Sequence, residues 1–295
     1  MKFRLLFLLI LASYVAVAQE HISAVYGGGG IYNGREYSVK EIKASGLNTV
    51  IVWTIHIDED GNLNFNVEFP LVTDGVYIGD QSHPNFRADM KALKSAGSSV
   101  QRIEFGLSAW GSPTYENIKN LIEKEGAGPS SRLYKNFKAL IEAIPEIDAF
   151  NNDDEVTYDV ASAVAFHTML FELGVKTTGV PYKNAATYWK PFTDQMLAAN
   201  PGSVDLMYLQ VYAGGKGNNP CDEKWQHLGV PIVPGLWAKG TSDGDKDAKQ
   251  IRKILNDWNK RCDIKGGFLW LYDDFDNSKL VSEYAEAINS VFDTN

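Results

Sequence analysis

The chain has 295 residues, of which 44% are hydrophobic and 12% are aromatic. This is enough apolar material for one large core or for two smaller domains, and it excludes a disordered chain. The formal net charge of −9 argues against nucleic acids and anionic membranes as partners, because both are themselves negatively charged. An uncharged partner suits this composition better.

The N-terminus has the pattern of a cleaved export signal. Lys2 and Arg4 precede a run of apolar residues that ends with small side chains at Ala18. The run is too short to span a bilayer comfortably, and no other segment approaches twenty apolar residues. We therefore expect a signal peptide over 1–18, one mature domain over 19–295, and a soluble protein that is secreted or periplasmic.

Strand and helix patterns alternate along the mature chain. The predicted strands are Ile22–Tyr26, Thr49–Ile57, Val100–Leu107, Ile147–Asn151, Val175–Val180, Val204–Val211, Val230–Leu236 and Gly266–Leu271. The predicted helices are Tyr37–Ser45, Asn85–Ala96, Pro113–Lys124, Ser131–Ala143, Tyr158–Leu173, Asn184–Ala198, Asp245–Trp258 and Ser278–Phe292. Eight such units in one chain predict an α/β fold, a single (β/α)8 TIM barrel, whose functional site lies at the carboxyl ends of the strands.

Two short motifs near the start of the chain each have two interpretations. The glycine run 27–30 resembles a phosphate-binding loop but lacks a GxGxxG frame and a P-loop lysine, so we favour close backbone approach at the barrel rim. The acidic segment 58–62 contains Asp60-Gly61, a hairpin turn signal. Calcium binding is the weaker interpretation of these acids, because the ligand frame of an EF-hand is missing.

Cysteine and histidine residues give little sign of a metal. Export would allow a disulfide between Cys221 and Cys262, but two free thiols fit the sequence equally well, since it does not show their separation. The five histidines are scattered, and neither HExxH nor CxxC is present. We expect no metal and no cofactor.

The predicted fourth strand is followed directly by several polar residues. Side chains alternate on an extended strand, so Asn151, Asp153 and Glu155 share one face. Two carboxyls this close share a proton, which raises one pKa toward neutrality, as hydrolysis of a glycosidic bond requires. The alternative is a solvated loop that caps the following helix. The position of the stretch at a barrel mouth favours the functional interpretation.

Three segments resemble one enzyme family. The sequence DAFNNDDE over 148–155 resembles the DxxDxDxE signature on strand four of glycoside hydrolase family 18, the chitinases and endo-β-N-acetylglucosaminidases, whose fold is a (β/α)8 barrel. The segment 206–212, LMYLQVY, is similar to strand six in the plant-type and endoglycosidase-like branches. The segment 266–270, GGFLW, resembles strand eight, whose Trp lies under the sugar at the bond to be cut.

The resemblance implies a role for each matching residue. Glu155 would be the general acid and later the base for water, and Asp153 would orient the 2-acetamido group of the substrate and stabilise its oxazolinium ion. The nucleophile would be the amide of the substrate itself. Tyr212 would hydrogen-bond to the acetamido oxygen, Gln210 would contact the sugar, and Trp270 would stack on its apolar face.

The chain also departs from the family pattern. Asn151 replaces the second acid of the signature, Asp154 replaces the usual aromatic residue, and FGLSA over 105–109 stands where SxGG is expected. We expect Asn151 to lie in the substrate-binding site and to be able to hydrogen-bond to Asp153. These differences favour an endo-β-N-acetylglucosaminidase over a chitinase.

Several aromatic residues at strand ends have two interpretations. Trp53, Trp110 and Trp237 could form platforms for sugars, and core packing explains each of them equally well. Core packing is also the alternative for Trp270.

We therefore expect a monomeric, endo-acting glycosidase that cleaves an oligosaccharide or the glycan of a glycoprotein with retention of configuration. The alternatives are a catalytically silent glycan-binding protein on the same barrel and a hydrolase that has moved to another sugar.

Overall fold

The computed structural model describes residues 21–183, 185–239, 246–274 and 278–293. The predicted signal peptide over 1–18 lies outside the described residues. So do the predicted helix starts at Asn184 and Asp245.

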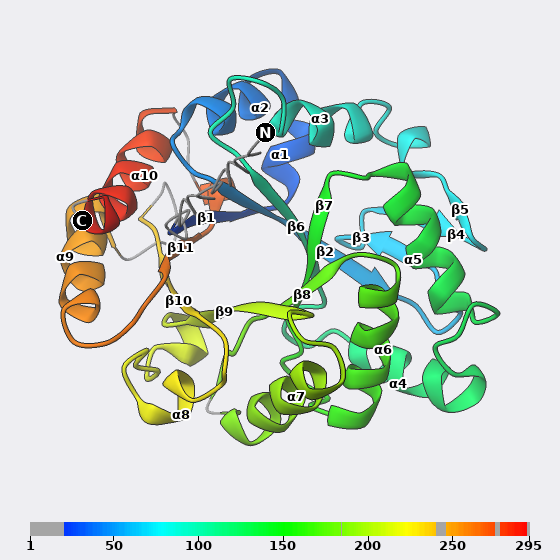
Figure 1. Cartoon of the computed structure of the whole chain (residues 1–295). Helices are drawn as coiled ribbons and strands as arrows, with labels where there is room; N and C mark the ends of the chain where they lie inside the picture. The colour runs from blue at the N-terminus through cyan, green and yellow to red at the C-terminus, as the bar shows by residue number, and fades with distance from the viewer. Residues whose placement is uncertain (1–20, 184, 240–245, 275–277, 294–295) are drawn as a thin grey trace, which may run out of the picture.

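Eight parallel strands of the described chain close into a barrel with helices around it, as Figure 1 shows in a view along the barrel. The strands are β1 (Ile22–Gly27), β2 (Thr49–Ile57), β6 (Arg102–Leu107), β7 (Ile147–Asn152), β8 (Lys176–Gly179), β9 (Val204–Gln210), β10 (Ile232–Trp237) and β11 (Gly266–Trp270). Each strand pairs with the next, and β1 closes the ring by pairing with both β2 and β11. The predicted (β/α)8 barrel is confirmed.

An antiparallel extension of the sheet follows β2. It consists of β3 (Leu63–Phe65), β4 (Phe69–Thr73) and β5 (Val76–Tyr77). The Asp58 carboxylate accepts the backbone N–H groups of Asp60 (2.9 Å) and Asn62 (2.8 Å), which holds the predicted turn between β2 and β3. The hairpin prediction is therefore confirmed, whereas β4 and β5 were not expected from the sequence.

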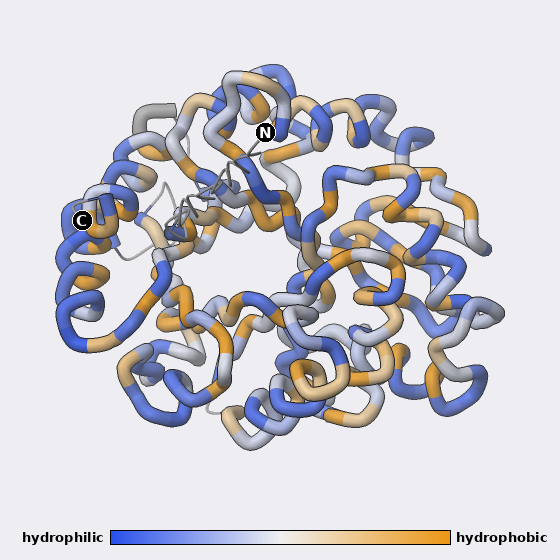
Figure 2. The backbone as a smooth tube through the Cα atoms, in the orientation of Figure 1, coloured by the Kyte–Doolittle hydropathy of each residue, from blue (hydrophilic) through white to orange (hydrophobic). Residues whose placement is uncertain are grey.

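The helices agree with the predicted ranges to within a few residues at most ends, except for the short α1 and α8, which were not predicted. They are α1 (Gly29–Asn33), α2 (Arg35–Ala44), α3 (Phe86–Leu93), α4 (Thr114–Glu125), α5 (Arg132–Ala143), α6 (Val160–Glu172), α7 (Ala186–Ala199), α8 (Glu223–Gln226), α9 (Ala248–Asn259) and α10 (Ser278–Phe292). Hydrophilic and hydrophobic stretches alternate along the outer helices in Figure 2. This alternation is expected of helices with one face on a barrel and one in solvent. None of the described helices has the length and apolar character needed to cross a membrane.

The interior of the barrel has its own small core, separate from the larger core between strands and helices. Its buried members are Ala24, Tyr26, Ile51, Val180, Leu206, Tyr208, Tyr212, Val233 and Phe268. The three tyrosines bring hydroxyl groups into this apolar layer, and a buried hydroxyl needs a hydrogen-bond partner. The barrel centre therefore contains polar groups in fixed positions beneath its mouth.

The glycine run after β1 lies close to neighbouring backbone. A Cβ atom at Gly28 would lie 2.9 Å from the carbonyl oxygen of Trp53, so no larger side chain fits without movement. The N–H groups of Gly28 and Gly30 both donate to the carboxylate of Asp273, each at 2.8 Å. Close backbone approach is confirmed, and these donors bind a carboxylate of the chain itself.

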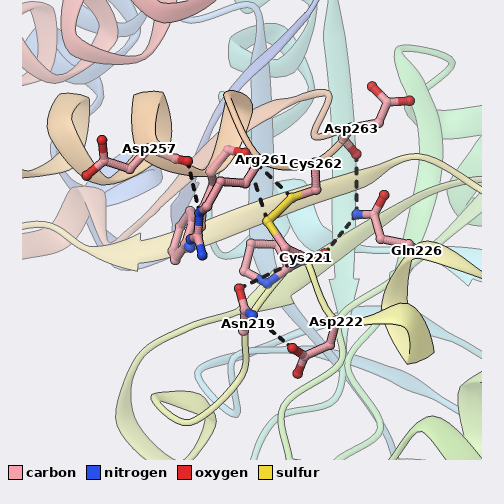
Figure 3. Close-up of a disulfide and its surroundings, with 10 residues drawn as sticks. Asn219, Cys221, Asp222, Gln226, Asp257, Arg261, Cys262 and Asp263 are labelled. Carbon is pink, nitrogen blue, oxygen red and sulfur yellow. Dashed lines mark hydrogen bonds between the residues drawn. A yellow bond between two sulfur atoms is a disulfide. The ribbon is translucent and has the colours of Figure 1, made fainter.

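Cys221 and Cys262 form a disulfide, with a Cα–Cα distance of 5.3 Å. Figure 3 shows that the bond joins the segment before α8 to the segment just after α9. Nearby, the side-chain amide of Gln226 donates to the carbonyl oxygen of Asp263. The bond joins residues 41 positions apart, so loop-closure entropy gives it a stabilising effect of about 4 kcal/mol. This decides between the two interpretations that the sequence left open.

Candidate active site

A pocket of about 270 Å³ opens at the carboxyl ends of the barrel strands. Its lining residues are Tyr26, Trp53, Ala109, Trp110, Asp153, Glu155, Val180, Tyr182, Gln210, Tyr212, Ala213, Trp237 and Trp270. Most of the lining is aromatic, and the acidic groups come from the segment after β7. This position is the one that a (β/α)8 barrel uses for a functional site.

Asp153 and Glu155 lie side by side at the end of β7. The N–H of Asp153 donates to the carbonyl oxygen of Leu107 (3.1 Å), which continues the pairing with β6 by one residue. The amide nitrogen of Gln210, at the end of β9, donates to Oε1 of Glu155 (2.9 Å) and to Oδ1 of Asp153 (3.2 Å). The structure thus brings together three of the residues that the sequence singled out.

Burial keeps protons on this carboxyl pair. It is the largest cause that raises the pKa of Asp153 well above its ordinary value, and the neighbouring charge of Glu155 adds to it. Burial also raises the pKa of Glu155, although the Gln210 hydrogen bond and the charge of Lys183 act in the opposite direction. Oε2 of Glu155 is buried and has no hydrogen-bond partner within the described part of the chain. The pair can therefore keep a proton at a pH where exposed carboxyls are ionised.

The other polar residues of this stretch cap backbone groups. The Asp154 carboxylate accepts the N–H groups of Val156, Thr157 and Tyr158 at 3.1, 2.8 and 2.7 Å. Asp159 caps α6 by accepting from the N–H of Ser162 (2.9 Å). The capping interpretation thus fits Asp154 and Asp159, whereas Asp153 and Glu155 face the pocket.

Asn151 does not lie in the pocket. It is fully buried one layer below, where its Oδ1 accepts from the Tyr26 hydroxyl (2.8 Å) and its amide donates to Thr178 (2.8 Å) and Glu104 (3.5 Å). None of these hydrogen bonds reaches Asp153. The expectation that Asn151 contacts substrate and Asp153 is therefore corrected, because its hydrogen-bonding groups are used inside the barrel.

Aromatic rings form the remaining walls. Tyr212 and Trp270 stack with ring centroids 6.0 Å apart, and Trp53 meets Trp270 edge-on at 5.2 Å. Burial raises the pKa of Tyr212 well above its ordinary value, so its hydroxyl keeps a proton that it can donate. Trp110 is 74% exposed beside the pocket. Trp53, Trp110, Trp237 and Trp270 all line the pocket, as the platform interpretation requires. Except for Trp110, they also pack against the small core of the barrel.

Tyr26 and Tyr182 line the pocket but were not predicted as site residues. Tyr26 is on β1, and Tyr182 follows β8. Both lie at or just past the end of a predicted strand. That position alone could have identified them as residues of the mouth.

Among the described residues, no group of three or more His, Cys, Asp or Glu side chains could hold a metal ion. The acidic turn over 58–62 is no exception.

No protein-family model matches the sequence, and no curated protein matches it significantly. Solved structures are similar to it. Chitinase ChiA74 from Bacillus thuringiensis has a TM-score of 0.62 at 12% identity, over 91% of this chain and 70% of that one. The GH18 chitinase ChiB from the chitin utilization locus of Flavobacterium johnsoniae has a TM-score of 0.60 at 13% identity, over 91% and 94%. The spore cortex-lytic enzyme SleL of Bacillus cereus has a TM-score of 0.59 at 12% identity, over 90% and 74%.

At such low identity these likenesses establish the fold. The fold that these structures share with this chain is the (β/α)8 barrel expected from the sequence, and the resemblance to glycoside hydrolase family 18 stays a prediction.

Proposed function

We propose that the protein is an exported glycoside hydrolase that cleaves β-linked, GlcNAc-containing glycans with retention of configuration. The observation that carries this proposal is the carboxyl pair of buried Asp153 and half-buried Glu155, which lies in an aromatic pocket at the barrel mouth with both pKa values raised. A protonated carboxyl beside a second carboxyl is the acid and stabiliser that glycosidic hydrolysis needs.

In the first step of the proposed reaction, Glu155 donates its proton to the glycosidic oxygen as the bond from that oxygen to the anomeric carbon breaks. The acetamido oxygen of the substrate forms a bond to the same carbon, which gives an oxazolinium ion. Asp153 accepts the amide N–H of the sugar and stabilises the positive charge, and the Tyr212 hydroxyl orients the acetamido group. The sugar ring stacks on Trp270.

In the second step Glu155 takes a proton from water as the water oxygen bonds to the anomeric carbon. The bond to the acetamido oxygen breaks, and the substrate regains its amide. Two inversions at one carbon give overall retention. The unpartnered Oε2 of Glu155 supports this role, since a buried polar atom without a partner is suited to a ligand.

The substrate class is proposed from the pocket and from the sequence variants. The similar structures are named as chitinases and as an enzyme that lyses spore cortex. In this chain Asn151 and Asp154 replace family residues and are used for hydrogen bonds inside the protein. We favour an endo-β-N-acetylglucosaminidase that acts on an oligosaccharide or on the glycan of a glycoprotein, as a monomer outside the cytoplasm.

Mass spectrometry of products tests this proposal. The substrates are chitooligosaccharides, high-mannose and complex N-glycopeptides, and oligosaccharides without acetamido groups. We expect cleavage after GlcNAc by the wild type and not by Glu155→Gln. Glu123→Gln, which changes an exposed glutamate on α4, is the matched control and should cleave normally.

The other outcomes separate the alternatives. Cleavage confined to sugars without an acetamido group would keep the hydrolase and contradict the substrate-assisted step. Binding without cleavage by all three proteins would favour the silent glycan-binding protein.

A further inference from the structure

A second carboxylate is buried in the barrel beneath the candidate site. Glu104 on β6 is fully buried and forms an ion pair with Arg102 (2.6 Å). It also accepts the hydroxyl protons of Tyr208 (2.8 Å) and Thr178 (2.5 Å). Such a set of donors lets a carboxylate persist in a barrel interior. The catalytic steps described above do not use Glu104.

Glu104 determines which way the Asn151 amide points. A carboxylate only accepts hydrogen bonds, and the single hydroxyl proton of Thr178 already goes to Glu104. The NH2 group of Asn151 must therefore face Thr178 (2.8 Å) and Glu104 (3.5 Å). Its oxygen consequently faces the opposite way, toward the Tyr26 hydroxyl (2.8 Å).

Tyr26 connects this chain of hydrogen bonds to the pocket. Its ring lines the pocket together with Asp153, and burial and then the charge of Asp153 raise its pKa, so the hydroxyl is protonated. A hydroxyl has one proton, and Tyr26 donates it to Asn151. It is therefore not donated to Asp153. A further donor would stabilise ionised Asp153 and lower its pKa.

We propose that Glu104 is a positioning residue, which acts through Asn151 to direct the Tyr26 proton away from Asp153, so that the Asp153/Glu155 pair keeps the proton that Glu155 donates in the first step. That this proton takes part in catalysis rests on the proposed function. The effect of Glu104 on the pKa of the carboxyl pair can be measured without substrate.

The charged groups around Glu104 determine whether it can be replaced without leaving another charge unpaired. Arg102 lies on the same strand, and Tyr208 and Asp205 come from β9. In register, the strands on either side place apolar residues opposite Glu104, which are Ile51 of β2 and Ala149 of β7.

Arg102 also holds Asp205 with two hydrogen bonds (2.9 and 3.0 Å), and Lys176 of β8 pairs with the same carboxylate (3.2 Å). Glu104→Gln therefore does not leave Arg102 without a partner.

The experiment is a titration of the Asp153/Glu155 pair by carboxyl ¹³C NMR in the full chain, with resonances assigned by Asp153→Asn. In Glu104→Gln the new amide can donate to Asn151, whose oxygen no longer has to face Tyr26, and the Tyr26 proton can turn to Asp153. We expect the apparent pKa of the pair to fall by about one unit, the usual effect of one added hydrogen bond to a carboxylate. Asp205→Asn is the matched control, because it removes one negative charge from the same network without touching Asn151; its shift should be much smaller.

Tyr26→Phe is the second variant, since loss of one hydroxyl oxygen should not prevent folding. We expect it not to raise the apparent pKa of the pair, and we expect Glu104→Gln to have no further effect in the Tyr26→Phe background. Equal shifts in Glu104→Gln and Asp205→Asn would overturn the proposal. A raised pKa of the pair in Tyr26→Phe would overturn the proposal too, because it would mean that Tyr26 donates to Asp153 in the wild type. If Glu104→Gln does not fold, the Tyr26→Phe titration alone tests the proposal. If the wild type has no glycosidase activity, the proposed function is contradicted, but these titrations still test the role of Glu104.

Discussion

The barrel contains two groups of carboxyls, each with one buried member, and the groups differ in their partners. In the lower group Glu104 is paired with Arg102, which also binds Asp205. In the upper group Asp153 and Glu155 share one amide donor from Gln210, and their pKa values are raised. With Lys176 also paired to Asp205, the charges of the lower group are balanced and Glu104 is hydrogen-bonded, so this group holds its neighbours in place and does not itself react. The upper group keeps a proton and an unpartnered oxygen, which are the features of a site that binds and reacts.

The largest effect that we predict is on activity in the upper group. Glu155→Gln should lower kcat about 10²- to 10⁴-fold, the usual contribution of a general acid. The free energy of unfolding should not fall, because the substitution removes one of two neighbouring carboxyls whose charges repel each other. Kinetics on the substrate found by mass spectrometry, together with urea unfolding, measure both quantities. Normal turnover with reduced stability would place Glu155 with the structural group.

The corresponding test of the lower group should change stability. Arg102→Met leaves Glu104 as an uncompensated buried charge and should lower the free energy of unfolding by about 3 to 5 kcal/mol. The control is Arg87→Met, which breaks an ion pair with Asp80 in which the arginine side chain is 52% exposed. That change should be under about 1 kcal/mol by urea denaturation. Equal changes in the two variants would remove the distinction between the groups.

A smaller effect should appear in the pH dependence of stability. The pKa of Asp153 is raised in the folded state, so its stabilising contribution is complete below the ordinary value of 3.8 and is lost as pH rises through the folded pKa. Asp153→Asn removes this dependence and should gain stability relative to the wild type as pH rises. The gain is about 1.4 kcal/mol for each unit of raised pKa. Urea unfolding from pH 3 to pH 8 measures it, and a difference that is constant with pH would show that the carboxyl is not perturbed.

The sequence predicted the upper group better than the lower one. Asp153 and Glu155 follow from strand alternation and from a local motif, both of which need only neighbouring residues. Glu104 on the neighbouring strand β6 and Tyr26 on β1 hydrogen-bond to Asn151, which is 47 and 125 positions away in the chain. Strand register decides such contacts, and the residues of one strand do not reveal it. The same lack of register led to the wrong expectation for Asn151.

Other parts of the fold show the same limit. Most barrel strands lie in apolar runs with clear boundaries, so the architecture followed from their number and order. The two residues of β5 are too few for a periodic signal, and β4 contains Pro70, a residue that counts against a strand in a sequence pattern. The Cys221–Cys262 bond depends on a distance between two loops that sequence does not give.

The central claim is that the upper group works with the acetamido group of the substrate. Time-resolved ¹H NMR of the newly formed reducing end, on the GlcNAc-containing substrate that the enzyme cleaves, tests it most directly. Two inversions at the anomeric carbon predict that the β-anomer appears first and then mutarotates. Initial formation of the α-anomer would show a single inversion by water and would contradict the account.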